Sequence, residues 1–212
     1  MQRGQSEIPL DPDWMEQALE KPLPGHNAHR KMSVRAPNTM EIPEGAAEAA
    51  VMIAFLEDPE PGGFPLIQRP GNQGPHSGQI SLPGGKREHG ESLEETALRE
   101  TEEEIGLPAR KIRVLGSLTP LYIPVSGFAV YPYVGWVSGK VTFRRDPLEV
   151  EEILFYDLRR LMDPGFRTIF DFQYNGRPFQ SPGFKLEERI IWGATAMILM
   201  ELTDHLQSRA SL

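Results

Sequence analysis

Cysteine is absent from the 212 residues of this chain. Its absence excludes disulfides, thiolate nucleophiles, cysteine-bound zinc and iron–sulfur clusters. Histidine is also scarce, with five residues against 30 aspartates and glutamates. Any metal is therefore expected to be held mainly by carboxylate oxygens, which are the ligands that Mg²⁺ and Mn²⁺ prefer.

Basic residues are in the minority, because 22 lysines and arginines face 30 acidic residues and the formal net charge is −8. This balance argues against sequence-independent binding to nucleic acid or to anionic membranes, since both require a basic surface. A small polyanionic substrate is still compatible, because a local basic pocket or bound divalent cations can reverse the field. We expect neither nucleic acid nor a membrane as a partner.

Long hydrophobic runs are missing as well. The longest, residues 190–200, is too short to span a bilayer and is bracketed by Arg189 and Glu201. The first residues lack the apolar stretch of a secretory signal. These features predict a cytoplasmic protein in which residues 190–206 form a buried C-terminal helix.

The length allows one sizeable domain, and the composition, with 39% hydrophobic and 25% charged residues, is typical of globular proteins. Residues 1–40 are interpreted as an N-terminal extension, and residues 41–212 as the main domain. Asp11 followed by Pro12 predicts a helix N-terminus, with the helix running to Leu19. The extension is expected to be either a packed arm or a dimer element, so a homodimer stays open.

Strand and helix patterns are interleaved along the rest of the chain. A helix is expected near residues 158–161, a glycine-rich loop over residues 70–85, and strands over residues 47–55, 66–69, 114–121, 128–137 and 151–156. Asn175-Gly176 is a strong hairpin signal between two further strands. The crossovers are too few for a doubly wound parallel sheet. The pattern therefore predicts an α/β fold with a mixed sheet covered by helices.

A further helix is predicted from Ser92, which forms a capping box with Glu95, to Ile105. Glu100, Glu103 and Glu104 lie at i, i+3 and i+4, so their carboxylates crowd one face and repel one another. A divalent cation above that face would make the cluster favourable. The alternative is an ordinary solvated acidic surface.

Residues 85–107, GKREHGESLEETALRETEEEIGL, resemble the Nudix box, G-x5-E-x7-R-E-U-x-E-E-x-G-U, in which U is a bulky aliphatic residue. The positions in register are Gly85, Glu91, Arg99, Glu100, Glu103, Glu104, Gly106 and Leu107. Thr101 departs from the pattern in the first U position. The resemblance implies a Nudix hydrolase, an α/β/α sandwich with a mixed β-sheet flanked by helices, which cleaves a nucleoside diphosphate linked to another group.

The resemblance also implies residue roles. Mg²⁺ or Mn²⁺ would be held by Glu100, Glu103, Glu104 and the carbonyl of Gly85. Glu91 and Arg99 would brace the loop–helix–loop as a structural pair. The general base is left open among Glu100, Glu103 and a later acid, for which Glu149 is favoured over Glu151 and Glu152.

Three segments, residues 76–86, 121–137 and 190–202, resemble the coenzyme A pyrophosphatase branch of that family. Residues that keep the register of its extra signature are Leu66, Arg69, Gly78, Pro83, Gly84 and Gly85, and the departures are Pro65, Ile67, Pro70, Gly74 and Leu82. Arg69, His76 and Lys86 are the candidate cations for substrate phosphates.

The resemblance to this branch implies cleavage of coenzyme A into 3′,5′-ADP and 4′-phosphopantetheine. Hydrolysis of ADP-ribose or a nucleotide sugar is the alternative within the fold. A nucleotide sensor without catalysis is less favoured, because such domains usually have a damaged box and this chain keeps every carboxylate.

Overall fold

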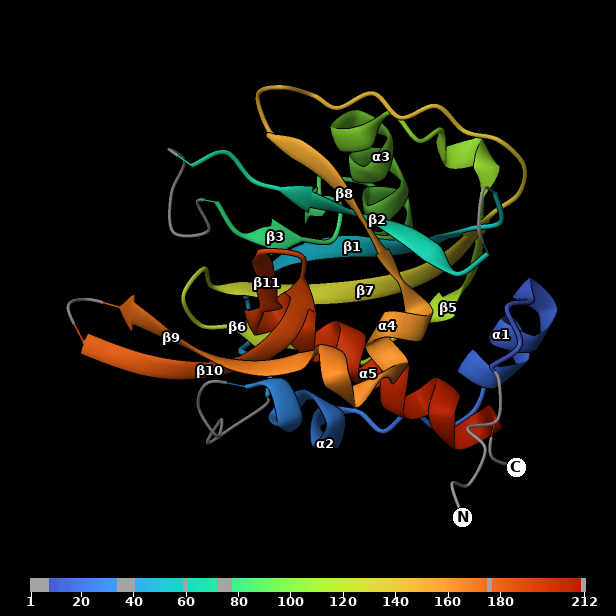
Figure 1. Ribbon diagram of the computed structural model, residues 1–212. Coiled ribbons are helices and arrows are strands. Elements are labelled where there is room, and N and C mark those ends of the chain that lie inside the picture. Colours follow the sequence, from blue (N-terminus) through green and yellow to red (C-terminus); the bar gives the residue numbers. More distant parts are fainter. Residues whose placement is uncertain (1–7, 34–40, 59–60, 72–77, 175–176, 211–212) are drawn as a thin grey trace, which may run out of the picture.

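The computed structural model describes residues 8–33, 41–58, 61–71, 78–174 and 177–210, and Figure 1 shows their arrangement. A mixed sheet is built around β1 (Ala47–Leu56), which runs parallel to β7 (Phe128–Val137) from the pair Ala47–Phe128 to the pair Leu56–Val137. The other strands of this sheet are β2 (Gly63–Gln68), β3 (Ile80–Ser81), β4 (Gly84–Lys86), β5 (Ile112–Ser117), β6 (Leu121–Ile123) and β8 (Glu152–Asp157). The main path is β3-β2-β1-β7-β5, with β4 on β1, β6 on β7 and β8 on β2.

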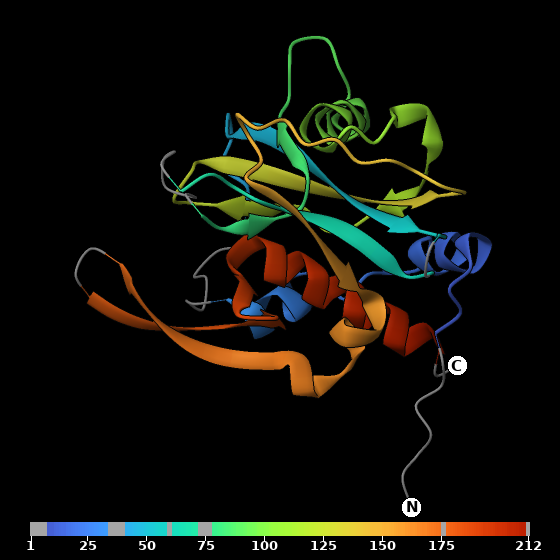
Figure 2. The same ribbon diagram turned by 45° about the horizontal axis from the view of Figure 1, so that its top comes forward.

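Helices cover both faces of this sheet (Figures 1 and 2). The helix α3 (Leu93–Ile105) lies on one face, and α5 (Gly193–Ala210) lies on the other together with α2 (His26–His29) and α4 (Leu158–Met162). Short 3₁₀ turns occur at Arg30–Met32, Ala109–Lys111 and Pro164–Phe166. The predicted α/β/α sandwich with a mixed sheet is confirmed. Within the described residues, no helix combines the length and apolarity needed to cross a membrane.

A second, antiparallel sheet is formed by β9 (Arg167–Tyr174), β10 (Arg177–Leu186) and β11 (Arg189–Trp192). The β9–β10 hairpin extends beyond the body of the molecule (Figure 1). Its strands pair from Tyr174–Arg177 onward, while the predicted Asn175-Gly176 turn lies outside the described residues.

Three predicted elements differ from the structure. The C-terminal helix begins at Gly193 rather than at residue 190, because residues 190–192 belong to β11 and pair with β10. A continuous apolar run does not distinguish a buried strand from a buried helix, which explains the error. The expected strand over residues 114–121 is divided between β5 and β6, and the expected loop over residues 70–85 contains β3 and β4.

The N-terminal segment packs on this domain. Met15, Leu19 and Met32 are buried in the core that α5 forms with the sheet, and α1 (Pro12–Leu19) begins at the N-cap Asp11 as predicted. The division at residue 40 stays a prediction, but the described part of the extension behaves as a packed arm. A second core lies between the sheet and α3.

A buried carboxylate fixes the arm. Glu201 of α5 has no exposed surface and accepts hydrogen bonds from Gly25 N (3.1 Å), His29 Nε2 (2.9 Å) and Thr119 N (3.1 Å). The Thr119 hydroxyl donates as well. One side chain thus joins α2, the β5–β6 turn and α5.

We expect Glu201→Gln to lower the free energy of unfolding by about 3 kcal/mol, because the amide leaves buried donors without an acceptor. Asp204→Asn is the matched control, since Asp204 also lies on α5 and pairs with arm residue Lys31, but at the surface. Asp204→Asn should lower the free energy of unfolding by less than about 1 kcal/mol. Urea unfolding measures both, and equal losses would contradict the assigned role of Glu201.

Candidate active site

The helix α3 is fixed at both ends by local interactions. The Ser92 hydroxyl accepts from Glu95 N (3.2 Å), and the Glu95 carboxylate accepts from Ser92 N (2.7 Å), which is the predicted capping box. Gly106 ends the helix in the left-handed conformation (φ 69°). Thr101, the departure from the box, is buried and its hydroxyl donates to Ala97 O at 2.7 Å, so its polar group is satisfied inside the helix.

An arginine ties the loop before α3 to the helix. Arg99 donates from Nε and Nη2 to the two oxygens of Glu91 at 3.0 and 2.9 Å, and from Nη2 to Lys86 O at 3.2 Å. The Glu91 carboxylate also accepts from Glu88 N at 2.7 Å. The hydrogen bonds from Arg99, followed by that from Glu88, lower the pKa of Glu91 to about 2. The pair therefore holds the loop closed while Glu91 is ionised.

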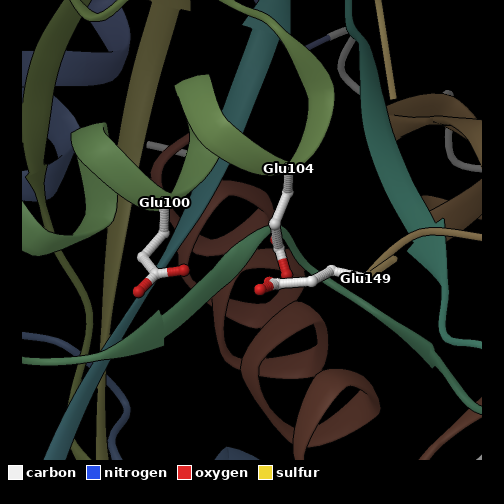
Figure 3. Close-up of side chains that lie close together, drawn as sticks. All are labelled: Glu100, Glu104 and Glu149. Atoms are coloured by element: carbon white, nitrogen blue, oxygen red, sulfur yellow. The ribbon is translucent and has the colours of Figure 1, made fainter. Parts of the chain in front are cut away.

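Three carboxylates converge at one point, as Figure 3 shows. Glu100 and Glu104 project from successive turns of α3, Glu149 reaches them from the segment before β8, and oxygens of all three lie within 4.8 Å of one another. Backbone hydrogen bonds hold the segment to the end of α3, from Arg144 N to Ile105 O and from Asp146 N to Glu104 O, both at 2.9 Å. Glu149 is thus positioned by the path of the chain.

Glu104 is the buried member of this cluster, with 1% of its surface exposed. Gly84 N donates to its Oε2 at 2.8 Å, and Arg69 Nη2 lies 3.7 Å from its Oε1. Burial raises the pKa of Glu104 to about 8, although Arg69 and Gly84 favour the charged form, and the charges of Glu100 and Glu149 raise it further. A carboxylate in this position requires either a proton or a nearby cation.

Glu100 lies against the backbone of Gly85. A Cβ atom added at Gly85 would come within 2.4 Å of the Glu100 carboxylate, so only glycine allows this approach. Burial raises the pKa of Glu100, and the bonds from Arg99 oppose that shift. Gly84, which is not among the predicted site residues, precedes Gly85 in β4 and supplies the N–H to Glu104.

The cluster fits a divalent cation. The donors are all oxygen, as Mg²⁺ and Mn²⁺ prefer, and the charge of the cation would offset both the mutual repulsion and the cost of burying Glu104. Oxygens bound to one Mg²⁺ at about 2.1 Å lie at most about 4.2 Å apart. Small side-chain rotations would therefore bring Glu100, Glu104 and Glu149 into coordination.

The comparisons with known proteins agree with this geometry. The model of the family described as NUDIX domain matches residues 47–171, which includes α3 and all three carboxylates. The chain belongs to the Nudix family. It is thus a Nudix pyrophosphohydrolase of a family that acts on small-molecule nucleotides and generally uses divalent metals.

Two relatives bear the description "Uncharacterized Nudix hydrolase NudL". The protein from Yersinia enterocolitica is 36% identical over 178 residues, covering 82% of this chain and 89% of the relative. The one from Photorhabdus laumondii is 30% identical over 172 residues, covering 81% and 91%. A Nudix hydrolase structure from Nitrosomonas europaea superposes with a TM-score of 0.52 at 15% identity, over 80% of this chain and 74% of that one, which supports the fold alone.

Other candidate residues of the Nudix site are placed differently. Glu103 lies outside the three-carboxylate cluster, with 59% of its side chain exposed, and it accepts from Arg99 Nη1 at 2.9 Å. Lys86 is exposed on β4. Glu152 pairs with Arg189 at 2.6 Å, away from the cluster. His76 and Gly74 lie outside the described residues. The roles of Glu103, Lys86 and His76 stay predictions.

Gly85→Ala is expected to displace the Glu100 carboxylate and reduce turnover by about 10²-fold, the loss typical of an ångström-scale misplacement. The reason is the 2.4 Å contact that the new Cβ would make. Gly71→Ala is the control, because a Cβ at Gly71 meets nothing within 4 Å. Hydrolysis rates and the Mg²⁺-induced rise in melting temperature are measured for both variants. A Gly85→Ala protein with unimpaired turnover would contradict the proposed contact between Gly85 and the Glu100 carboxylate.

Proposed function

We propose that this Nudix enzyme hydrolyses coenzyme A and its thioesters in the presence of Mg²⁺ or Mn²⁺, giving 3′,5′-ADP and the 4′-phosphopantetheine. The convergence of Glu100, Glu104 and Glu149 beside Gly85 carries the hydrolytic part of the proposal. The choice of coenzyme A follows from the branch signature that leads into β4, in which Gly84 N donates to Glu104 and Arg69 lies 3.7 Å from it.

Three of the five signature departures leave the charge around the carboxylates unchanged, whereas Gly74 replaces an arginine of the signature and lies outside the described residues. Ile67 and Leu82 are buried in the two cores, with 0% and 1% exposure, and Pro65 is buried within β2. These substitutions change packing rather than the charge around the carboxylates. Arg69 keeps 35% of its side chain exposed beside Glu104, where a substrate phosphate could reach it.

Each residue then has a stated role in the proposed reaction. Glu100, Glu104 and Glu149, with the carbonyl of Gly85, would hold the cations, and Glu103 is the remaining predicted ligand. Bound divalent cations would neutralise the diphosphate and lower the pKa of a water molecule. Arg69 binds the departing or retained phosphate. A general base, for which Glu149, Glu100 and Glu103 are the candidates, removes a proton from the attacking water.

The test is hydrolysis of the diphosphate or polyphosphate linkage in coenzyme A, acetyl-CoA, ADP-ribose, NADH, UDP-glucose and diadenosine polyphosphates, measured from the phosphorylated products formed. We expect Mg²⁺- or Mn²⁺-dependent cleavage of coenzyme A well above the others and no cleavage with EDTA. Preference for ADP-ribose or a nucleotide sugar would overturn the coenzyme A assignment alone. Tight nucleotide binding with no turnover of any compound would instead favour the sensor.

Replacing each carboxylate by its amide separates ligands from the base. Loss of a ligand such as Glu104 (Glu104→Gln) should remove both turnover and the Mg²⁺-induced rise in melting temperature. Loss of the base should lower kcat by about 10²–10⁴-fold and leave that rise intact. Glu94→Gln, on the exposed side of α3, should change neither. Unchanged turnover in Glu103→Gln would exclude Glu103 from the site.

A further inference from the structure

A cavity lies at the edge of the main sheet, where β3 contacts β11 and β2 ends. It has a volume of about 350 Å³, within the range of small-molecule sites. The residues that line it are Gln68, Gly78, Gln79, Ile80, Arg189, Ile190 and Trp192. None of these is among the site residues predicted from the sequence, although Gly78 keeps the register of the branch signature.

The lining combines an aromatic wall with directional polar groups. Trp192 is half-buried, and its ring packs on Phe172 and Phe170 with centroids 5.0 and 5.7 Å away. These phenylalanines lie on β9, so the projecting hairpin packs against the indole. Two carboxamides and one guanidinium complete the lining. An aromatic surface beside carboxamides suits a purine, which stacks and offers adjacent donor and acceptor atoms.

The cavity and the carboxylate cluster both lie near the end of β2. Gln68 lines the cavity, and the next residue, Arg69, lies 3.7 Å from Glu104. Gln68 also pairs with Glu152 of β8, three residues after Glu149. Glu152 in turn holds Arg189 through a 2.6 Å ion pair. The chain at the end of β2 therefore contributes Gln68 to the cavity and Arg69 to the surroundings of the cluster, and Glu152 at the start of β8 holds Arg189 of the cavity wall.

We propose that this cavity binds the purine nucleotide part of the substrate, with Trp192 stacking on the base and Arg189 facing a phosphate. The identity of the substrate in this inference depends on the proposed function. Gln68 and Gln79 would read the edge of the base, since a carboxamide can bind the adjacent nitrogens of adenine. Arg189 keeps donors beyond its bond to Glu152, because a guanidinium has five N–H groups.

The test measures binding of 3′,5′-ADP and of 4′-phosphopantetheine by calorimetry, with no divalent cation added. Trp192→Leu should weaken the binding of 3′,5′-ADP roughly 10-fold or more, as loss of base–aromatic stacking predicts, and leave 4′-phosphopantetheine unaffected. Trp14→Leu is the matched control, because Trp14 is also half-buried but lies on α1. The inference is overturned if the Trp192→Leu protein binds 3′,5′-ADP as tightly as the wild type does. It is also overturned if the affinities for 3′,5′-ADP and 4′-phosphopantetheine fall equally.

Two further measurements keep the test decisive. Arg189→Gln changes an exposed ion pair rather than packing, so it can be measured even if Trp192→Leu fails to fold. It should weaken the binding of 3′,5′-ADP several-fold. An unchanged affinity would count against the inference. Binding of 3′,5′-ADP to the wild type should also quench tryptophan fluorescence, and Trp192→Phe should abolish the quench.

If coenzyme A is cleaved with an unchanged KM in Trp192→Leu, this inference alone fails. If Trp192-dependent binding occurs without hydrolysis of any compound, the proposed function alone fails.

Discussion

The carboxylate of Glu104 is almost completely removed from water and yet lies within reach of two other carboxylates. Such an arrangement is costly, and burial alone raises the pKa of Glu104 strongly. Two features of the chain offset part of the cost, namely the N–H of Gly84 and the guanidinium of Arg69. A bound cation would offset the rest of the unfavourable free energy of burying this charge. The helix α3, the strand β4 and the segment of Glu149 all place their groups around the position of that cation.

Contacts around the cluster hold its residues in place. Arg99 binds Glu91 with two hydrogen bonds and also reaches Glu100 at 2.8 Å, so one guanidinium orients a ligand candidate and closes the loop. Capping at Ser92 and Gly106 fixes where α3 begins and ends. On the other face of the sheet, Glu201 holds the N-terminal arm on α5. The two buried acids thus organise opposite sides of one sheet.

Much of the site could be predicted because its spacing is local. A helix places residues at i and i+4 on one face, so Glu100 and Glu104 were predictable, as was the capping box. Glu149 was a weaker prediction, because its position depends on backbone hydrogen bonds to the end of α3 that no sequence pattern encodes. Trp192 was interpreted as part of a helix. Only its pairing within the second sheet places it in β11 beside Gln68.

The sequence by itself determined the family, the α/β class, the helix with its carboxylates and the preference for oxygen ligands, since each depends on residue type and short-range spacing. Tertiary structure decided which carboxylates meet. It brought Glu149 into the cluster and left Glu103 at the surface beside Arg99, although Glu103 occupies an equal place in the motif. It also brought β11 against β3, beside the end of β2, and so created the cavity lined by Trp192. These outcomes depend on contacts between residues distant in the chain, which residue spacing along one helix or strand cannot specify.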